Sequence, residues 1–149
     1  MSLRNIAIMP LFAALVLLAA CGNSGEQPKT EAAEAPKPPV YGKIQNVELA
    51  SVVDAPLAKK GEKIFKVICT ACHKYDQRYV GPAIGGVFNR RTPEYIMNMI
   101  LDTEVMLQKD DTARCLLQTY LVKMPNAQVN ETDARSVLEH LRDIAPQYK

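Results

Sequence analysis

The sequence predicts an all-α domain of about four helices, preceded by an export signal and a linker. Apolar residues after Ser51 recur at helical spacing and do not alternate as in a half-buried strand. Helix-capping residues and prolines stand at the starts of several of these stretches. After the predicted signal and the Pro-rich part of the linker, about 110 residues remain, which is enough for one small domain.

Residues 1–20 have the composition of a secretory signal. One positive charge, Arg4, precedes an apolar run from Ile6 to Leu18, and two alanines follow. A charged start, a short apolar core and small residues before a cut are typical of export signals. The run is shorter than the roughly 18 residues that a membrane-spanning helix needs. An uncleaved anchor helix and a plain signal peptide remain as alternatives.

The segment from Leu18 to Cys21 resembles the lipobox of bacterial lipoproteins. This resemblance implies a lipid on Cys21 and a protein on the periplasmic side of a bacterial membrane, inner or outer. Residues 21–50 are then predicted as a flexible, lipid-anchored linker, because their first half is rich in Pro, Glu, Lys and Ala. The folded domain is expected at 51–149.

The charge of the chain excludes one class of partner. It has 18 Lys and Arg against 16 Asp and Glu, whereas nucleic-acid-binding domains usually carry a strong basic excess. We therefore expect no nucleic acid as a partner.

The first helix is predicted at 54–69. Asp54 is a suitable N-cap, and Pro56 fits the first turn of a helix. The apolar or small residues that recur at helical spacing are Leu57, Gly61, Ile64, Phe65 and Ile68.

Three further helices are predicted at 93–101, 110–122 and 131–144. Thr92 as N-cap with Pro93 after it marks the start of the second. Asn130 or Thr132 caps the last, whose apolar stripe is Val137, Leu138, Leu141 and Ile144.

Two cysteines and a histidine are packed into Cys69-Thr-Ala-Cys72-His73, and three chemistries use such a cluster. A redox dithiol of the thioredoxin kind needs a strand before the motif, but a helix is predicted there. Zinc needs two more ligands, and only Cys115 and His140 remain, both isolated. C-x-x-C-H is the pattern of covalent haem attachment, in which the thiols bond to the porphyrin and the histidine ligates iron. Export also fits this third chemistry, which we favour.

On these residues the chain resembles class I cytochrome c. The likeness covers GEKIFKVICTACH, VGPAIGGVFNRRTPEYI and MPNAQVNETDARSVLEHLR, or most of 54–145. It implies a small fold of about four helices around one covalent haem c, with Gly61 and Phe65 where the first and last helices cross. The last two segments are similar to cytochromes associated with respiratory reductases.

The iron needs a second axial ligand opposite His73, and several side chains qualify. Met97 and Met99 lie in a predicted helix, where methionine usually fills the core, and Met106 lies near an expected helix break. His140 is predicted mid-helix as a surface or rim residue. Met124 is favoured, because Pro125 stiffens the loop that follows it, and because in the resembling family the ligand sits in a loop before the last helix.

Further residues have weaker assignments. By resemblance, the carbonyl of Pro82 accepts a hydrogen bond from the ring of His73, unless Gly81-Pro82 is only a turn. Arg90, Arg91 and Tyr95 are candidates for contact with the haem propionates, or else a solvated surface. Five lysines cluster around the motif: Lys59, Lys60, Lys63, Lys66 and Lys74. They form either a basic rim that guides an acidic partner or only the solvent-exposed face of a helix. Cys115 is expected as a buried thiol.

The sequence therefore predicts an electron carrier, not an enzyme. With both axial positions held by His73 and Met124, the haem iron would pass single electrons between redox proteins, a donor and a terminal reductase or oxidase. Two alternatives remain: a haem gas sensor or haem enzyme with an open sixth position, and a fixed electron-entry subunit of a larger oxidoreductase.

Overall fold

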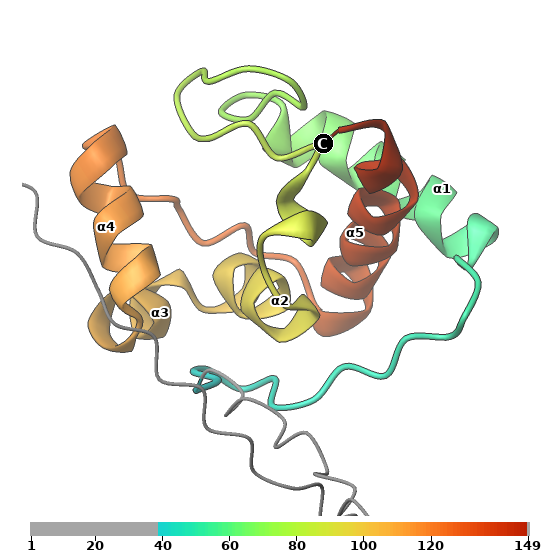
Figure 1. Cartoon of the computed structure of the whole chain (residues 1–149), viewed down its shortest axis with the longest axis horizontal. Helices are drawn as coiled ribbons and strands as arrows, with labels where there is room; N and C mark the ends of the chain where they lie inside the picture. Colours follow the sequence, from blue (N-terminus) through green and yellow to red (C-terminus); the bar gives the residue numbers. More distant parts are fainter. Residues whose placement is uncertain (1–38, 149) are drawn as a thin grey trace, which may run out of the picture. The chain divides into compact units, whose positions relative to one another are not determined.

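The computed structural model describes residues 39–148, and within them the fold is all-α, as predicted. The predicted signal, Cys21 and most of the predicted linker lie outside this range. The α-helices are α1 (Ala55–Ile64), α2 (Pro93–Leu101), α3 (Thr103–Lys109), α4 (Asp111–Tyr120) and α5 (Glu131–Ile144) (Figure 1). None of the helices in 39–148 is long and apolar enough to cross a membrane.

Helices α1 and α5 cross at Gly61, as the sequence predicts. A β-carbon on Gly61 would lie 1.9 Å from the carbonyl oxygen of Ser136, so the two backbones approach within a distance that only glycine allows. Phe65, Val137 and Leu138 close the core beside this crossing, each 2% exposed or less. Burial of these side chains holds the first and last helices together.

Local signals place three helix starts. The side chains of Asp54, Thr92 and Asn130 each accept a hydrogen bond from a backbone N–H of the first helical turn. The helices predicted at 93–101 and 131–144 are confirmed at both ends. The first predicted helix, 54–69, is α1 followed by a π-helical turn at Phe65–Cys69.

The helix predicted at 110–122 is confirmed as α4, within two residues at each end, but the helix before it was not predicted. This additional helix, α3, spans Thr103–Lys109 and ends directly before α4. Asp102 caps α3 and Asp110 caps α4, each accepting from a backbone N–H three residues on. Asp110 thus ends one helix and starts the next, and Met106, expected near a break, lies inside α3 and is 1% exposed.

Residues 39–53 contain no helix or strand, yet they pack on the domain. Ile44, Val47 and Leu49 contact the core, and Figure 1 shows this segment passing α2 and α5 on its way to α1. The buried amide of Asn98 accepts from the N–H of Ile44 and donates to its carbonyl, at 3.0 and 2.8 Å. The packed domain therefore includes residues from 44 on, which the sequence analysis had assigned to the flexible linker.

Candidate functional site

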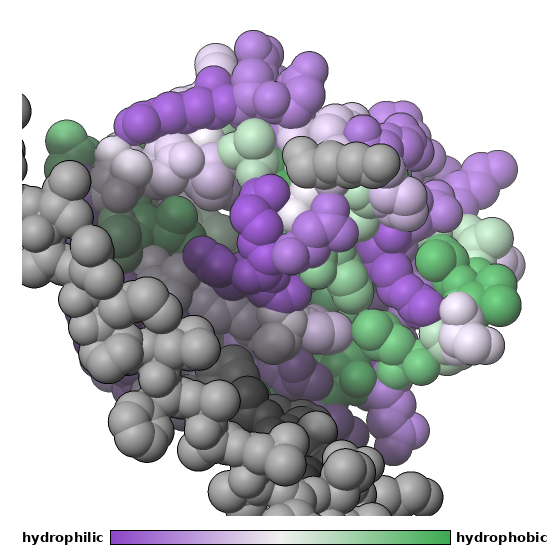
Figure 2. All heavy atoms as spheres, in the orientation of Figure 1, coloured by the Kyte–Doolittle hydropathy of each residue, from purple (hydrophilic) through white to green (hydrophobic). Residues whose placement is uncertain are grey.

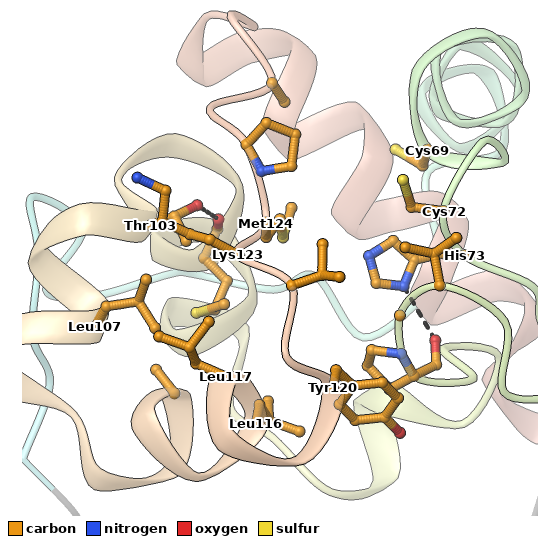
Figure 3. A pocket seen from close by; sticks show the side chains of 18 of the residues that line it. Cys69, Cys72, His73, Thr103, Leu107, Leu116, Leu117, Tyr120, Lys123 and Met124 are labelled. Carbon is orange, nitrogen blue, oxygen red and sulfur yellow. Dashed lines mark hydrogen bonds between the residues drawn. The ribbon is translucent and has the colours of Figure 1, made fainter.

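One apolar cavity opens beside the Cys-x-x-Cys-His motif, and we call it the CTACH cavity. Figure 2 shows hydrophobic side chains in a recess between α4 and the loop that follows the motif. The side chains that line it come from two stretches, 68–82 and 99–127, and include Ile68, Cys69, Cys72, His73, Val80, Pro82, Met99, Leu107, Leu116, Leu117, Tyr120, Val122 and Met124. Figure 3 shows Cys69, Cys72 and His73 on one side and Met124, Leu107 and Leu117 on the other.

The motif is positioned by the turn that ends the first helical segment. After the π-helical turn, the N–H groups of Cys72 and His73 both donate to the carbonyl of Cys69, at 3.1 and 2.9 Å. This tight turn directs both thiols and the imidazole to one cavity. Burial raises the pKa of the Cys69 thiol to about 11, so it is protonated at neutral pH and is a poor redox thiolate.

The imidazole of His73 is fixed by the loop at 80–86. Its Nδ1 lies 3.0 Å from the carbonyl oxygen of Pro82. Since a carbonyl only accepts, Nδ1 carries the proton and Nε2 keeps the lone pair that binds a metal. Gly81 packs against the ring, where a β-carbon would come within 2.6 Å of Cε1 of His73. The N–H of Gly81 donates to the carbonyl of Cys72 at 2.8 Å, which ties the loop to the motif.

Of the predicted second ligands, Met124 and Met99 reach the CTACH cavity. Met124 lies in the irregular segment between α4 and α5, and Met99 lies on α2. Met97 is 2% exposed within the core, and Met106 lines a different cavity.

His140 is not a surface residue, contrary to the prediction. It is 5% exposed, and its Nε2 lies 2.8 Å from the hydroxyl of Tyr75. The pKa of His140 is lowered, mainly because the imidazole is buried. Tyr75 also stacks on Phe65 with ring centroids 4.8 Å apart. His140 therefore joins the motif loop to α5 and does not reach the CTACH cavity.

Arg90, Arg91 and Tyr95 line a second cavity, which we call the Arg91 cavity, and not the first. The Arg91 guanidinium lies over the Tyr95 ring, 5.5 Å from its centroid. The Tyr95 hydroxyl is buried and finds no hydrogen-bond partner within residues 39–148. Burial raises the pKa of Tyr95, so this hydroxyl is an unused donor.

The remaining predicted residues lie outside both cavities. Lys66 pairs with Glu62 and Lys60 with Asp133, so two lysines of the expected basic rim are engaged within the chain. Cys115 is exposed, which contradicts the prediction of a buried thiol. On α4 the neighbouring Leu116 and Leu117 line the cavity instead, and Cys115 occupies the outer face.

The contribution of α3 and α4 to the site was not predicted from the sequence. Leu107, Leu116, Leu117 and Tyr120 supply much of the apolar lining. The guanidinium of Arg78 donates to the carbonyl of Thr119 and lies 4.4 Å from the centroid of the Tyr120 ring, which ties the motif loop to α4. The spacing of Leu116, Leu117 and Tyr120 was the available signal, because residues three and four apart share a helix face.

Comparison with known proteins agrees with this geometry. The family described as Cytochrome c matches residues 58–145. A cytochrome c2 of Rhodopseudomonas palustris is 28% identical over 112 residues, which are 58% of this chain and 80% of the relative. The structure of cytochrome c from Rhodothermus marinus is 40% identical, with a TM-score of 0.70 over 71% of this chain and 91% of the other. An engineered form of that protein, bound to a carbene intermediate, is 41% identical, with a TM-score of 0.66 over 70% of this chain and 91% of the other.

The fold, the Cys-x-x-Cys-His motif and the family match agree, and the motif spacing implies covalent haem c. The chain belongs to the cytochrome c family.

Proposed function

We propose that this protein is a monohaem electron carrier whose iron is held by His73 and Met124. The observation that carries the proposal is the CTACH cavity, which has two thiols and an oriented imidazole on one side and a methionine on the other. This donor set and its apolar lining fit a haem bonded through Cys69 and Cys72. When bound, the haem supplies the redox-active iron.

The side chains of the chain set the conditions for that chemistry. The Pro82 carbonyl holds the proton on Nδ1 of His73, which fixes the ring and raises the basicity of Nε2. Leu107, Leu116 and Leu117 give the cavity an apolar lining, which disfavours water around a bound haem. With the Met124 thioether and the His73 imidazole as its ligands, the iron would favour the reduced state and would suit electron transfer rather than reaction with a substrate.

Arg91 and Tyr95 are proposed to bind the haem propionates. The buried Tyr95 hydroxyl without a partner in the described chain and the guanidinium beside it are two donors suited to a carboxylate. Arg90 lines the same cavity but donates to the carbonyl of Ala83 at 3.0 Å. Its guanidinium is therefore already engaged within the chain.

The family and the first residues of the chain support a location outside the cytoplasm. Bacterial cytochromes c are extracytoplasmic, and the export signal predicted at 1–20 agrees with this. We propose that Cys21 carries the lipid anchor and that the domain meets its donor and a terminal reductase or oxidase at the membrane surface.

The ligand assignment is tested by carbon monoxide binding to the reduced, haem-loaded protein. The wild type is expected to keep its absorption spectrum when carbon monoxide is added, because both axial positions are held. Met124→Leu should open the sixth position, bind carbon monoxide and lower the reduction potential. Met99→Leu is the matched control, since Met99 lines the same cavity and should leave both properties unchanged.

The outcomes separate the candidate functions. Carbon monoxide binding by the wild type would contradict the carrier and favour a gas sensor or haem enzyme. A response of Met99→Leu in place of Met124→Leu would move the ligand to α2. Co-purification with larger subunits would identify a fixed electron-entry subunit.

A further inference from the structure

Two stretches of the chain, 72–75 and 81–85, carry His73 and Pro82, and we call them the ligand loops. Backbone N–H groups of the second stretch donate to carbonyls of the first at three places: Gly81 to Cys72, Ile84 to Lys74 and Gly85 to Tyr75, at 2.8, 3.0 and 2.9 Å. One of these bonds precedes the contact between His73 and the Pro82 carbonyl, and two follow it. A shift of either loop would therefore move that carbonyl relative to the imidazole.

Tyr75 connects the ligand loops to the last helix. Its hydroxyl lies 2.8 Å from Nε2 of His140, which belongs to α5 and is 5% exposed. Its ring stacks on that of Phe65, and it meets the His140 ring edge-on with centroids 5.8 Å apart. The backbone carbonyl of the same residue accepts from Gly85. Tyr75 thus reaches from α5 to both ligand loops.

The bond between His140 and Tyr75 fixes more than the aromatic packing around it does. Apolar packing tolerates small displacements of a ring, whereas a hydrogen bond is directional and is costly to leave unmade between buried groups. Water cannot readily replace the partner of His140, because this imidazole is buried in the core. Neither residue lines the CTACH cavity, so an effect on His73 has to pass through the ligand loops.

We propose that His140 and Tyr75 are positioning residues for His73. Their hydrogen bond holds the ligand loops on α5 and so keeps the Pro82 carbonyl in place at Nδ1 of His73. The inference rests on the proposed function in one respect, namely that Nε2 of His73 binds the haem iron. A carbonyl that accepts from Nδ1 makes Nε2 more basic, and stronger donation to the iron favours the oxidised state. The pair therefore lowers the reduction potential of the haem-loaded protein.

The test uses variants of the haem-loaded protein that keep the ring and remove the hydrogen bond. Tyr75→Phe removes the hydroxyl and keeps the ring that stacks on Phe65. His140→Phe removes Nε2 and keeps an aromatic ring in the core, and the double variant combines both changes. Tyr148→Phe is the matched control, because its ring centroid lies 6.1 Å from that of Tyr75 but its hydroxyl takes no part in the bond to His140.

The first measurement is the exchange of the Nδ1 proton of His73 with solvent, followed by NMR in the reduced state. Exchange requires the contact with the Pro82 carbonyl to open, so looser ligand loops give faster exchange. Loss of one hydrogen bond, about 1 kcal/mol, corresponds to about fivefold faster exchange. We expect this factor in both single variants and in the double variant, and the wild-type rate in Tyr148→Phe.

The second measurement is the reduction potential. The equilibrium constant for reduction by a fixed donor should rise about threefold in the variants, which is about 30 mV for a one-electron couple. The single and double variants should show the same rise, because each of them removes the same bond. A merely structural role would lower the Tm of the variants and would leave the potential unchanged.

A wild-type exchange rate or a wild-type potential in Tyr75→Phe would overturn the proposal, whatever its stability. Additive shifts in the double variant, or a shift in Tyr148→Phe, would overturn it as well, since the effect would not come from the bond to His140. Tyr75→Phe decides the question if His140→Phe takes up no haem. Failure of the proposed function has a different signature: carbon monoxide binding by the wild type concerns the Met124 side of the iron and leaves both measurements on His73 in force.

Discussion

Gly61→Ala tests whether the α1–α5 crossing limits the stability of the domain. The new β-carbon would lie 1.9 Å from the carbonyl oxygen of Ser136, 2.3 Å from its carbonyl carbon and 2.8 Å from the backbone nitrogen of Val137. All three are backbone atoms of α5, so no side chain can turn aside. The two helices must separate, which loosens the contacts of Phe65 and Leu138.

The expected loss is large for one methyl group. Overpacking typically costs about 1–3 kcal/mol, and a clash with rigid backbone belongs at the upper end. Alanine returns about 1 kcal/mol through its higher helix propensity. We expect a net loss of about 2 kcal/mol, which lowers the Tm of a domain of this size by roughly 10–15 °C.

Thermal unfolding of the haem-loaded protein, followed by circular dichroism, measures this loss. A pair of variants at Lys63, an exposed position of α1, gives the effect of helix propensity alone: Lys63→Ala should be more stable than Lys63→Gly by about 1 kcal/mol. Gly61→Ala should have the opposite sign. A Tm equal to or above that of the wild type would refute the packing argument.

Two further predictions concern buried polar contacts. Asn98→Leu leaves the N–H and carbonyl of Ile44 without their partner, so the free energy of unfolding should fall by about 1–3 kcal/mol. Hydrogen exchange across 43–49 should become faster, and the haem spectrum should not change. Unchanged exchange would show that the segment is held by other contacts. Burial lowers the pKa of His140, so the folded protein binds fewer protons than the unfolded one, and stability should fall as pH drops below about 6.5. Denaturant midpoints measured between about pH 7.5 and pH 5 should show this fall in the wild type and a smaller one in His140→Gln; equal slopes would exclude His140 as the cause.

The parts of the fold that were predicted correctly are those with local signals. A cap followed by proline fixed the start of α2, and a cap with an apolar stripe fixed α5. The region from 102 to 110 was misread, because Asp102 and Asp110 look like breaks in the sequence but act as N-caps of consecutive helices. Residues 44–49 have no periodicity at all, and they are held by Asn98 and Glu94, some fifty positions away.

The site shows the same division between local and tertiary signals. The three residues of the motif and Met124 are recognisable from short stretches, and the structure brings them to one cavity. The burial of His140 depends on Tyr75, 65 positions earlier, and no local pattern indicates that contact. The exposure of Cys115 follows from the orientation of α4, which is set by the leucines it turns inward.

The π-helical turn at Phe65–Cys69 links the length of this segment to its geometry. A π-turn holds one residue more than a regular α-helical turn, so deleting one residue between Phe65 and Cys69 would restore an ordinary helix. Because the wide turn absorbs that residue, the deletion would leave both thiols and the imidazole of His73 facing Met124, whereas the same number of residues in regular α-helical geometry, at about 100° per residue, would turn them away. Substitutions at the exposed Val67 are readily accommodated by comparison. In related chains this stretch should therefore be one residue shorter wherever the π-turn is absent.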